Sequence, residues 1–428
     1  MKLSFIFIFF FTINLFADIQ LVKKENTDSN TTLLVIAGIH GNEPGGYFAA
    51  SILATHYKIT SKNLWIVPNL NKDSIRANKR GVNGDMNRKF AKISSKDRDK
   101  KTILQIKDII LSKNISLVLN LHDGHGFYRK ENQGSIFNPN AWGQTCVIDQ
   151  CTLKETQEFG DLNSIALKVK NNINKKLLKK HHSFNVKNTQ TKYDDEAMQL
   201  SLTYFAVTND KPAFAVETSK NLSSLSQKVF YQLLAIEEFM KIMEIKFTRD
   251  FEFNEQKIDK IIKNYGTLKI NDNILLNFRD IKNTLSYLPI ESKSNVFKFS
   301  HPLGSYKKIK GNYVVFVGNK KLTTLRPQYF KIAKNCADNF DVYIDGKIET
   351  VDKTSDFIVN ADFKVLKKKN YRVNVIGYHA KGHVDESNRL ISLKSLNRRF
   401  SVDKGHKVYR VEFYKNNEFC SMNMVHFR

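Results

Sequence analysis

The stretch that most constrains the fold is LLVIAGIHGNEPGG, residues 33–46, in which an apolar run breaks directly into a turn. Such a run is typical of a strand buried inside a parallel sheet, where helices cover both faces. The glycines of the turn allow tight backbone bends, and Pro44 suits the first turn of a following helix. The sequence therefore predicts an α/β unit in which His40 and Glu43 follow the carboxyl end of a strand.

A second apolar run indicates what these two side chains do together. An imidazole nitrogen and a carboxylate oxygen are ordinary zinc ligands, but a catalytic zinc needs a third protein ligand and an open position. The run ISLVLNL, residues 115–121, is followed at once by His122. An H-x-x-E pair alone is common by chance, so this second histidine at a strand end is what favours a metal site. We expect His40, Glu43 and His122 to meet at one edge of the sheet.

Four motifs in order resemble the zinc metallocarboxypeptidase superfamily, and among its branches the one of succinylglutamate desuccinylase and aspartoacylase. They are HGNEP at residues 40–44, RGVNGDMNRKF at residues 80–90, LHDGH at residues 121–125 and AFAVET at residues 213–218. The resemblance implies one zinc ion per chain, held by His40, Glu43 and His122. It also implies a mixed sheet flanked by helices.

The same resemblance assigns roles to four further residues. Asn87 and Arg88 match the pair that holds the terminal carboxylate of the substrate, a group that a guanidinium binds with two parallel hydrogen bonds. Arg80 matches the arginine that polarises the scissile carbonyl, although two neighbouring basic residues compete for this role. Glu217 matches the general base, which takes a proton from water and passes it to the leaving amine.

The amino-terminal segment predicts export. Residues 1–17 begin with one lysine, continue with an apolar run at residues 3–16 and end in alanine, as in a signal peptide that is too short to cross a bilayer comfortably. Leu15 stands where a small residue usually precedes the cleavage point, so an uncleaved anchor is the alternative. Both forms place the protein outside the cytoplasm, and we expect it in the periplasm.

The formal net charge of +26 is unusual for a chain of 428 residues. A lysine-rich composition spread over solvated faces is one interpretation, and attraction to an anionic partner such as peptidoglycan peptides is the other. The sequence contains no recognisable motif for binding RNA or DNA, so no nucleic acid is expected as a partner. No integral membrane partner is expected either, and the sequence does not predict the oligomeric state.

The lengths of the apolar runs and the residues that separate them predict three domains after the signal peptide. The zinc carboxypeptidase domain is expected at residues 18–248, and a small, barrel-like all-β domain of short strands at residues 249–330. An immunoglobulin-like β-sandwich is expected at residues 331–428, with a hairpin around Asp345-Gly346. In an oxidising compartment the four cysteines permit three pairings, with Cys146–Cys151 and Cys336–Cys420 as one possibility and free thiols as the alternative.

An exported carboxypeptidase domain followed by two β domains resembles the cell-shape-determining DL-carboxypeptidases of helical and curved bacteria. The resemblance implies a peptidoglycan muropeptide substrate whose tripeptide stem is trimmed to a dipeptide, with release of the terminal meso-diaminopimelate from γ-D-glutamate. The alternatives are a zinc-dependent deacylase or carboxypeptidase for other N-acyl amino acids or peptides, and a wall-binding scaffold without activity.

Overall fold

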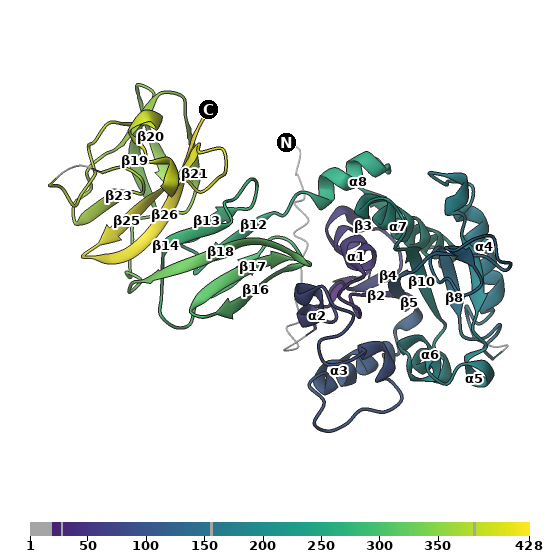
Figure 1. Cartoon of the computed structure of the whole chain (residues 1–428). Helices are drawn as coiled ribbons and strands as arrows, with labels where there is room; N and C mark the ends of the chain where they lie inside the picture. Colours follow the sequence, from purple (N-terminus) through teal and green to yellow (C-terminus); the bar gives the residue numbers. More distant parts are fainter. Residues whose placement is uncertain (1–18, 27–28, 155–156, 380–381) are drawn as a thin grey trace, which may run out of the picture. The chain divides into compact units, whose positions relative to one another are not determined.

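The computed structural model describes residues 19–26, 29–154, 157–379 and 382–428 (Figure 1). The chain divides into two compact units, Met1–Lys263 and Asn264–Arg428. The expected signal peptide at residues 1–17 lies outside the described residues. Within the described ranges, no helix combines the length and the apolar character that a membrane crossing requires.

A mixed seven-stranded sheet forms the centre of the first unit, in the order β1-β4-β2-β5-β10-β8-β9. Its strands are β1 (Val22–Lys24), β2 (Thr32–Ala37), β4 (Asn63–Val67), β5 (Ile115–Gly124), β8 (Thr145–Ile148), β9 (Asn185–Asn188) and β10 (Ala213–Ser219). The four strands β4, β2, β5 and β10 run parallel, whereas β1 and β8 pair antiparallel with their inner neighbours. Every residue of β2 is buried, as expected for a strand covered on both faces.

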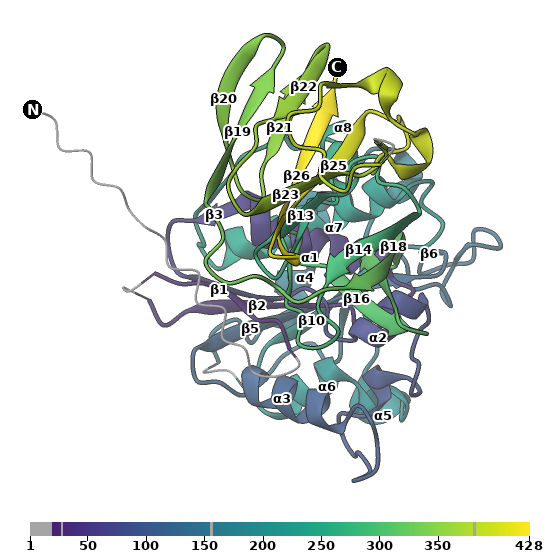
Figure 2. The ribbon, with the colours of Figure 1, turned by 90° about the vertical axis from the view of Figure 1, so that its left-hand side faces the viewer.

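Helices cover both faces of this sheet (Figure 2). On one face lie α1 (Pro44–His56), α4 (Leu162–Ile173) and α7 (Leu225–Ile242), and α7 contacts both of the others. On the other face lie α3 (Lys100–Ile110) and α6 (Leu202–Thr208). The predicted α/β class and the flanking helices are therefore confirmed. Shorter elements of this unit include α2 (Lys72–Ala77), a 3-10 turn at Met86–Arg88 and α8 (Glu255–Ile262).

The second unit is rich in β-strands, as predicted. Its first part has a three-stranded sheet, β13-β12-β15, and a four-stranded sheet, β14-β18-β17-β16. The strands are β12 (Thr267–Ile270), β13 (Ile274–Asn277), β14 (Thr284–Ile290), β15 (Phe297–Phe299), β16 (Gly304–Ile309), β17 (Asn312–Val317) and β18 (Lys320–Tyr329). The carboxyl-terminal part has two four-stranded sheets, β20-β19-β22-β24 and β21-β26-β25-β23.

The two carboxyl-terminal sheets enclose one apolar core, which includes Phe340, Phe363 and Phe413. Their strands are β19 (Asn339–Ile344), β20 (Lys347–Asp352), β21 (Asp356–Val359), β22 (Asp362–Val365), β23 (Tyr371–Val375), β24 (Ile391–Ser392), β25 (Val408–Lys415) and β26 (Glu418–Phe427). Asp345 and Gly346 join β19 to β20 with positive φ angles of 46° and 95°. Both signs match a type I′ turn, so the predicted hairpin is confirmed.

The division at Lys263 lies beyond residue 248, the expected end of the catalytic domain, because α8 packs on α7 of the first unit. Within the second unit, the Lys282 backbone N–H donates to the Val402 carbonyl, and this bond joins the early strands to the late ones. The expected domain limits at residues 248 and 330 stay predictions.

Two of the four cysteines form a disulfide. Cys336 and Cys420 are bonded across 84 residues, with their Cα atoms 5.9 Å apart. The other bridge of that pairing, between Cys146 and Cys151, does not form: Cys146 is buried in β8, whereas Cys151 is exposed beyond the end of that strand. The disulfide ties the segment before β19 to β26 and closes the carboxyl-terminal part on itself.

Replacing Cys336 and Cys420 together by alanine should destabilise the second unit by about 2–4 kcal/mol, because a long loop is no longer closed in the unfolded chain. Urea unfolding, monitored by far-UV circular dichroism, measures this loss of stability. Cys151→Ser is the matched control and should leave the transition unchanged. An unchanged transition in the double variant would contradict a stabilising role of the bridge.

Candidate active site

The turn after β2 is shaped by two glycines. Gly38 has a φ of +75°, and a Cβ added at Gly41 would lie 2.0 Å from the backbone of Ser74. A side chain at either position would strain or displace the turn. Glu43 precedes α1 without capping it through its side chain, and its carboxylate is buried among the residues of the site instead.

The three predicted metal ligands lie together at the edge of the sheet. One ligand atom from each of His40, Glu43 and His122 lies within 4.8 Å of the others, and all three side chains are buried. Nδ1 of His40 lies 3.1 Å from Oε1 of Glu43, and Nδ1 of His122 lies 2.8 Å from Oε2. His122 lies inside β5 rather than beyond its end, because that strand continues to Gly124. Two imidazole nitrogens and one carboxylate that line a cavity form a donor set suited to a divalent metal with an open position.

The charges of the three residues depend on one another. Burial alone would raise the pKa of Glu43, but the two histidines outweigh it and hold this pKa well below its ordinary value. Burial would lower the pKa of His40, whereas Glu43 and the neighbouring Asp85 raise it above its ordinary value. The site therefore favours a carboxylate at Glu43, the form that binds a metal.

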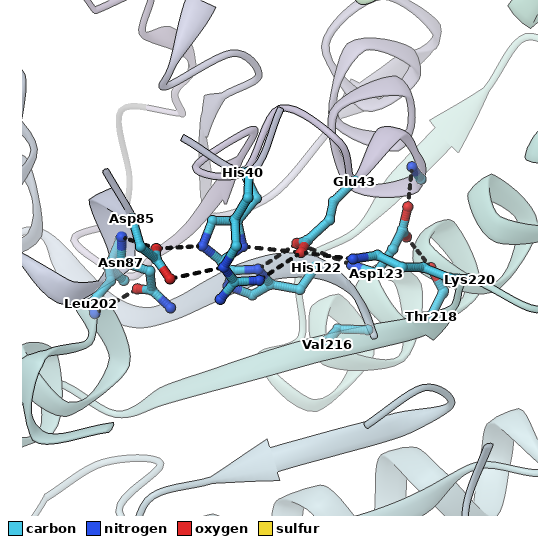
Figure 3. A network of polar contacts seen from close by, with 12 residues as sticks. His40, Glu43, Asp85, Asn87, His122, Asp123, Leu202, Val216, Thr218 and Lys220 are labelled. Atoms are coloured by element: carbon cyan, nitrogen blue, oxygen red, sulfur yellow. Dashed lines mark hydrogen bonds and ion pairs between the residues drawn. The ribbon is translucent and has the colours of Figure 1, made fainter. Parts of the chain in front are cut away.

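Asp85 supports His40 from behind (Figure 3). Its Oδ1 lies 2.8 Å from Nε2 of His40, and Nε of Arg80 donates to its Oδ2 at 2.9 Å. Burial opposes ionisation of Asp85, but His40 and Arg80 together lower its pKa. A carboxylate on the far nitrogen of a liganding histidine fixes the ring orientation and its tautomer. Sequence analysis left Asp85 without a role although it stands two residues before Asn87 in the quoted motif.

Glu217 lies next to the metal ligands on the neighbouring strand. It is the register partner of His122 between the parallel strands β10 and β5, and it lines the same cavity. Burial raises its pKa to about 7; His122 acts against this rise, and Glu43 and Asp123 add to it. A carboxyl group with a pKa near neutrality, beside a metal site, is suited to proton transfer.

Asn87 and Arg88 line the cavity from the 3-10 turn after β4. Oδ1 of Asn87 accepts the Leu202 backbone N–H at 3.0 Å, which anchors this side chain to the start of α6. The Arg88 guanidinium donates to the Asn87 carbonyl at 3.1 Å and contacts the sulfur of Met198 at 3.6 Å. Among the described residues no carboxylate pairs with Arg88, so its charge is available to an anion in the cavity.

Arg80 also lines the cavity, and its side chain is 47% exposed. Its Nη1 lies 3.4 Å from Oε1 of Glu43. The two basic residues that compete with it in the sequence are Arg76 and Lys79, and neither lines the cavity. Arg76 forms an ion pair with Asp73 on α2 instead.

Asp123 holds the elements of the site together and was not predicted. Its Oδ2 accepts the Gly45 backbone N–H in the first turn of α1 at 2.9 Å, and its Oδ1 accepts the Thr218 hydroxyl of β10. Nε2 of Gln232 on α7 donates to the His122 carbonyl at 2.7 Å. These contacts tie α1, β5, β10 and α7 to one another directly behind the metal ligands.

The segment of residues 127–160 contributes both to the cavity and to the sheet. Trp142 lines the cavity, whereas Thr145–Ile148 form β8 and pair with β10. The sequence TCVI is too short for its periodicity to identify a strand. Lys220, another lining residue that sequence analysis missed, directly follows β10.

The comparisons with known proteins agree with this geometry. The family model described as the catalytic part of carboxypeptidases controlling helical cell shape matches residues 2–263. A second model, described as the carboxyl-terminal domain of metallo-carboxypeptidase, matches residues 333–428. A comparison with curated protein sequences finds no match.

Solved structures of the cell shape determinant Csd4 from Helicobacter pylori are similar over nearly the whole chain. The apo form is 34% identical, covers 96% of this chain and 100% of its own, and has a TM-score of 0.88. The tripeptide-bound form is 35% identical with the same coverage and TM-score. The mDAP-bound form, described as a D,L-carboxypeptidase, is 34% identical, covers 95% and 100%, and has a TM-score of 0.89.

Asp85→Asn should weaken metal binding about 10–100-fold, because His40 loses the carboxylate that orients its ring. Competition against a chromogenic chelator measures the affinity without reference to turnover. Asp73→Asn, which removes a carboxylate from the neighbouring α2, is the control and should bind metal as the wild type does. Equal affinities for Asp85→Asn and wild type would contradict the supporting role.

Glu217 should make the metal-free protein less stable as the pH rises. Its pKa in the folded protein is about 7, above the ordinary value of 4.5. The folded state therefore retains the proton more strongly, and stability is lost between about pH 4.5 and 7. One pKa unit corresponds to about 1.4 kcal/mol. The free energy of unfolding of Glu217→Gln, relative to that of wild type, should therefore rise by about 3 kcal/mol between pH 4 and pH 8.

Urea unfolding of the chelated proteins at pH 4 and pH 8 measures this difference. Glu244→Gln, at an exposed glutamate of the same unit, should show no such gain. A stability difference between Glu217→Gln and wild type that stays constant with pH would refute the assignment.

Proposed function

Because this chain belongs to the family of carboxypeptidases that control helical cell shape, we propose that it is a zinc-dependent, periplasmic DL-carboxypeptidase acting on peptidoglycan tripeptides. The chain is a metallocarboxypeptidase. The reaction removes the terminal meso-diaminopimelate and leaves a dipeptide stem. The observation that carries the proposal is that the three expected metal ligands, the expected base and both expected arginines line one cavity.

Zinc is the metal that the donor set favours. Two imidazole nitrogens with one carboxylate are the ligands of several catalytic zinc sites. The cluster of His40, Glu43 and His122 fits this pattern in its residue types, its burial and the proximity of its ligand atoms. A zinc ion held by these residues would supply Lewis-acid chemistry, that is, polarisation of a carbonyl oxygen and a lowered pKa of water.

The substrate's terminal carboxylate is bound by Arg88 and Asn87. The Arg88 guanidinium has no carboxylate partner among the described residues, and it presents its donors in a planar fork that matches a carboxylate. The Asn87 side chain uses its oxygen for Leu202, which leaves its amide N–H groups for the same anion. Binding both groups at once orients the scissile bond.

Proton transfer falls to Glu217 and charge stabilisation to Arg80. The Glu217 carboxylate accepts a proton from the attacking water and delivers it to the nitrogen of the leaving amine. In the metal-free protein burial raises the pKa of this carboxyl group to about 7. Arg80, held by Asp85, donates to the oxygen of the scissile carbonyl as negative charge develops there.

Two features support a periplasmic location. The apolar leader at residues 1–17 has the order of regions found in signal peptides. The disulfide between Cys336 and Cys420 is typical of proteins that fold in an oxidising compartment.

Incubation of the purified protein with tripeptide-stem muropeptides should yield dipeptide stems and free diaminopimelate, detected by mass spectrometry. The conversion should disappear with a chelator and return with zinc. Glu217→Gln should reduce kcat by about 100-fold or more while it still binds zinc, because only the proton acceptor is removed. Turnover of other N-acyl amino acids with intact tripeptide would instead support the deacylase alternative.

A further inference from the structure

Lys220 is a cation in the cavity that the proposed reaction does not use. It follows β10 directly, and its Nζ lies 3.4 Å from Oε1 of Glu43. Its backbone N–H donates to the Gly124 carbonyl at 2.7 Å, so the start of the side chain is fixed at the cavity wall. The side chain itself is 35% exposed and lines the cavity.

Glu43 does not need this cation for its own stability. Its carboxylate already contacts His40, His122 and Arg80. Once Glu43 serves as a metal ligand, its charge is shared with the metal as well. A lysine with a structural role in this unit has more carboxylate partners. Lys89, for example, donates to both Asp97 and Asp99, which fix its position. Among the described residues, Lys220 has Glu43 as its one carboxylate partner.

Lys220 lies on the opposite side of the metal ligands from the pair that binds the terminal carboxylate. In Figure 3, Asn87 and Lys220 lie on opposite sides of His40, Glu43 and His122. Asn87 is anchored to α6, whereas Lys220 belongs to the segment that connects β10 to α7. The helices α6 and α7 cover opposite faces of the sheet. A substrate whose carboxylate lies at Asn87 and whose scissile carbonyl lies at the metal ligands extends its acyl part toward Lys220.

We propose that Lys220 forms an anion subsite that binds a carboxylate on the acyl side of the scissile bond. This carboxylate is the free α-carboxylate of the γ-linked D-glutamyl residue, an identification that rests on the proposed function. A γ-linked glutamyl residue always keeps that carboxylate free, a few bonds from the scissile carbonyl, whereas an α-linked residue has a carboxylate at that distance only if its side chain is acidic. An ammonium group at Lys220 therefore selects, by charge, an acyl residue with a free carboxylate over one that is neutral there.

The test compares two peptides that differ in this one group. The first is L-Ala-γ-D-Glu-meso-diaminopimelate, and the second carries a carboxamide in place of the D-glutamate α-carboxylate. Wild type should hydrolyse the acid with a kcat/KM about tenfold or more above that of the amide, because a charge-assisted hydrogen bond is lost in the amide. The preference should shrink at high salt, since Lys220 is partly exposed.

Lys220→Met should lower kcat/KM for the acid about tenfold and leave the amide nearly unchanged, so that the preference disappears. Lys220→Arg should retain most of it. Lys154→Met removes an exposed lysine that pairs with Asp210, and it should behave as wild type on both peptides. Bound zinc and the thermal midpoint of each variant show that the fold and the metal centre are intact.

Equal losses on both peptides in Lys220→Met would overturn the proposal, because Lys220 would then act only through Glu43. A preference of Lys220→Met for the acid that equals the preference of wild type would overturn the proposal as well. If wild type hydrolyses neither peptide while it binds zinc, the proposed function itself fails, and the subsite proposal falls with it. The wild-type measurement therefore separates the two failures.

Discussion

The site depends on one buried negative charge, the carboxylate of Glu43. A carboxylate with an exposed fraction of 4% is stable only if the surrounding groups compensate for the lost water. Two histidines and one arginine supply this compensation from three separate segments of the chain. The glycine-rich turn, the parallel strands and the helix that starts at Pro44 serve to bring these segments to one point.

The parts that local sequence predicted well are those that depend on backbone conformation. The apolar run at residues 33–36 lies within β2, and the proline after it begins α1. The hairpin at Asp345-Gly346 follows from residue types that tolerate positive φ. The grouping of His40, Glu43 and His122 was likewise foreseeable, because neighbouring parallel strands end at the same edge of a sheet. The enzyme class followed from the resemblance of four motifs to a known family.

What the sequence did not reveal depends on contacts between distant segments. Asp85 contacts His40 across 45 residues, Thr218 contacts Asp123 across 95, and Lys220 contacts Glu43 across 177. No spacing rule links such pairs, since their meeting depends on which strands become neighbours. The same limit applies to β8, a strand too short to show a period of its own, and to the choice among the possible cysteine pairings.

The pairing of His122 with Glu217 has a consequence for how activity is lost on heating. These two residues are register partners in the interior of the sheet, so the spacing between them is set by the backbone ladder of β5 and β10. Such strands open only when the whole unit opens. Heat inactivation is therefore expected to be an all-or-none event that coincides with melting of the first unit, without a preceding phase in which the folded enzyme becomes gradually less active.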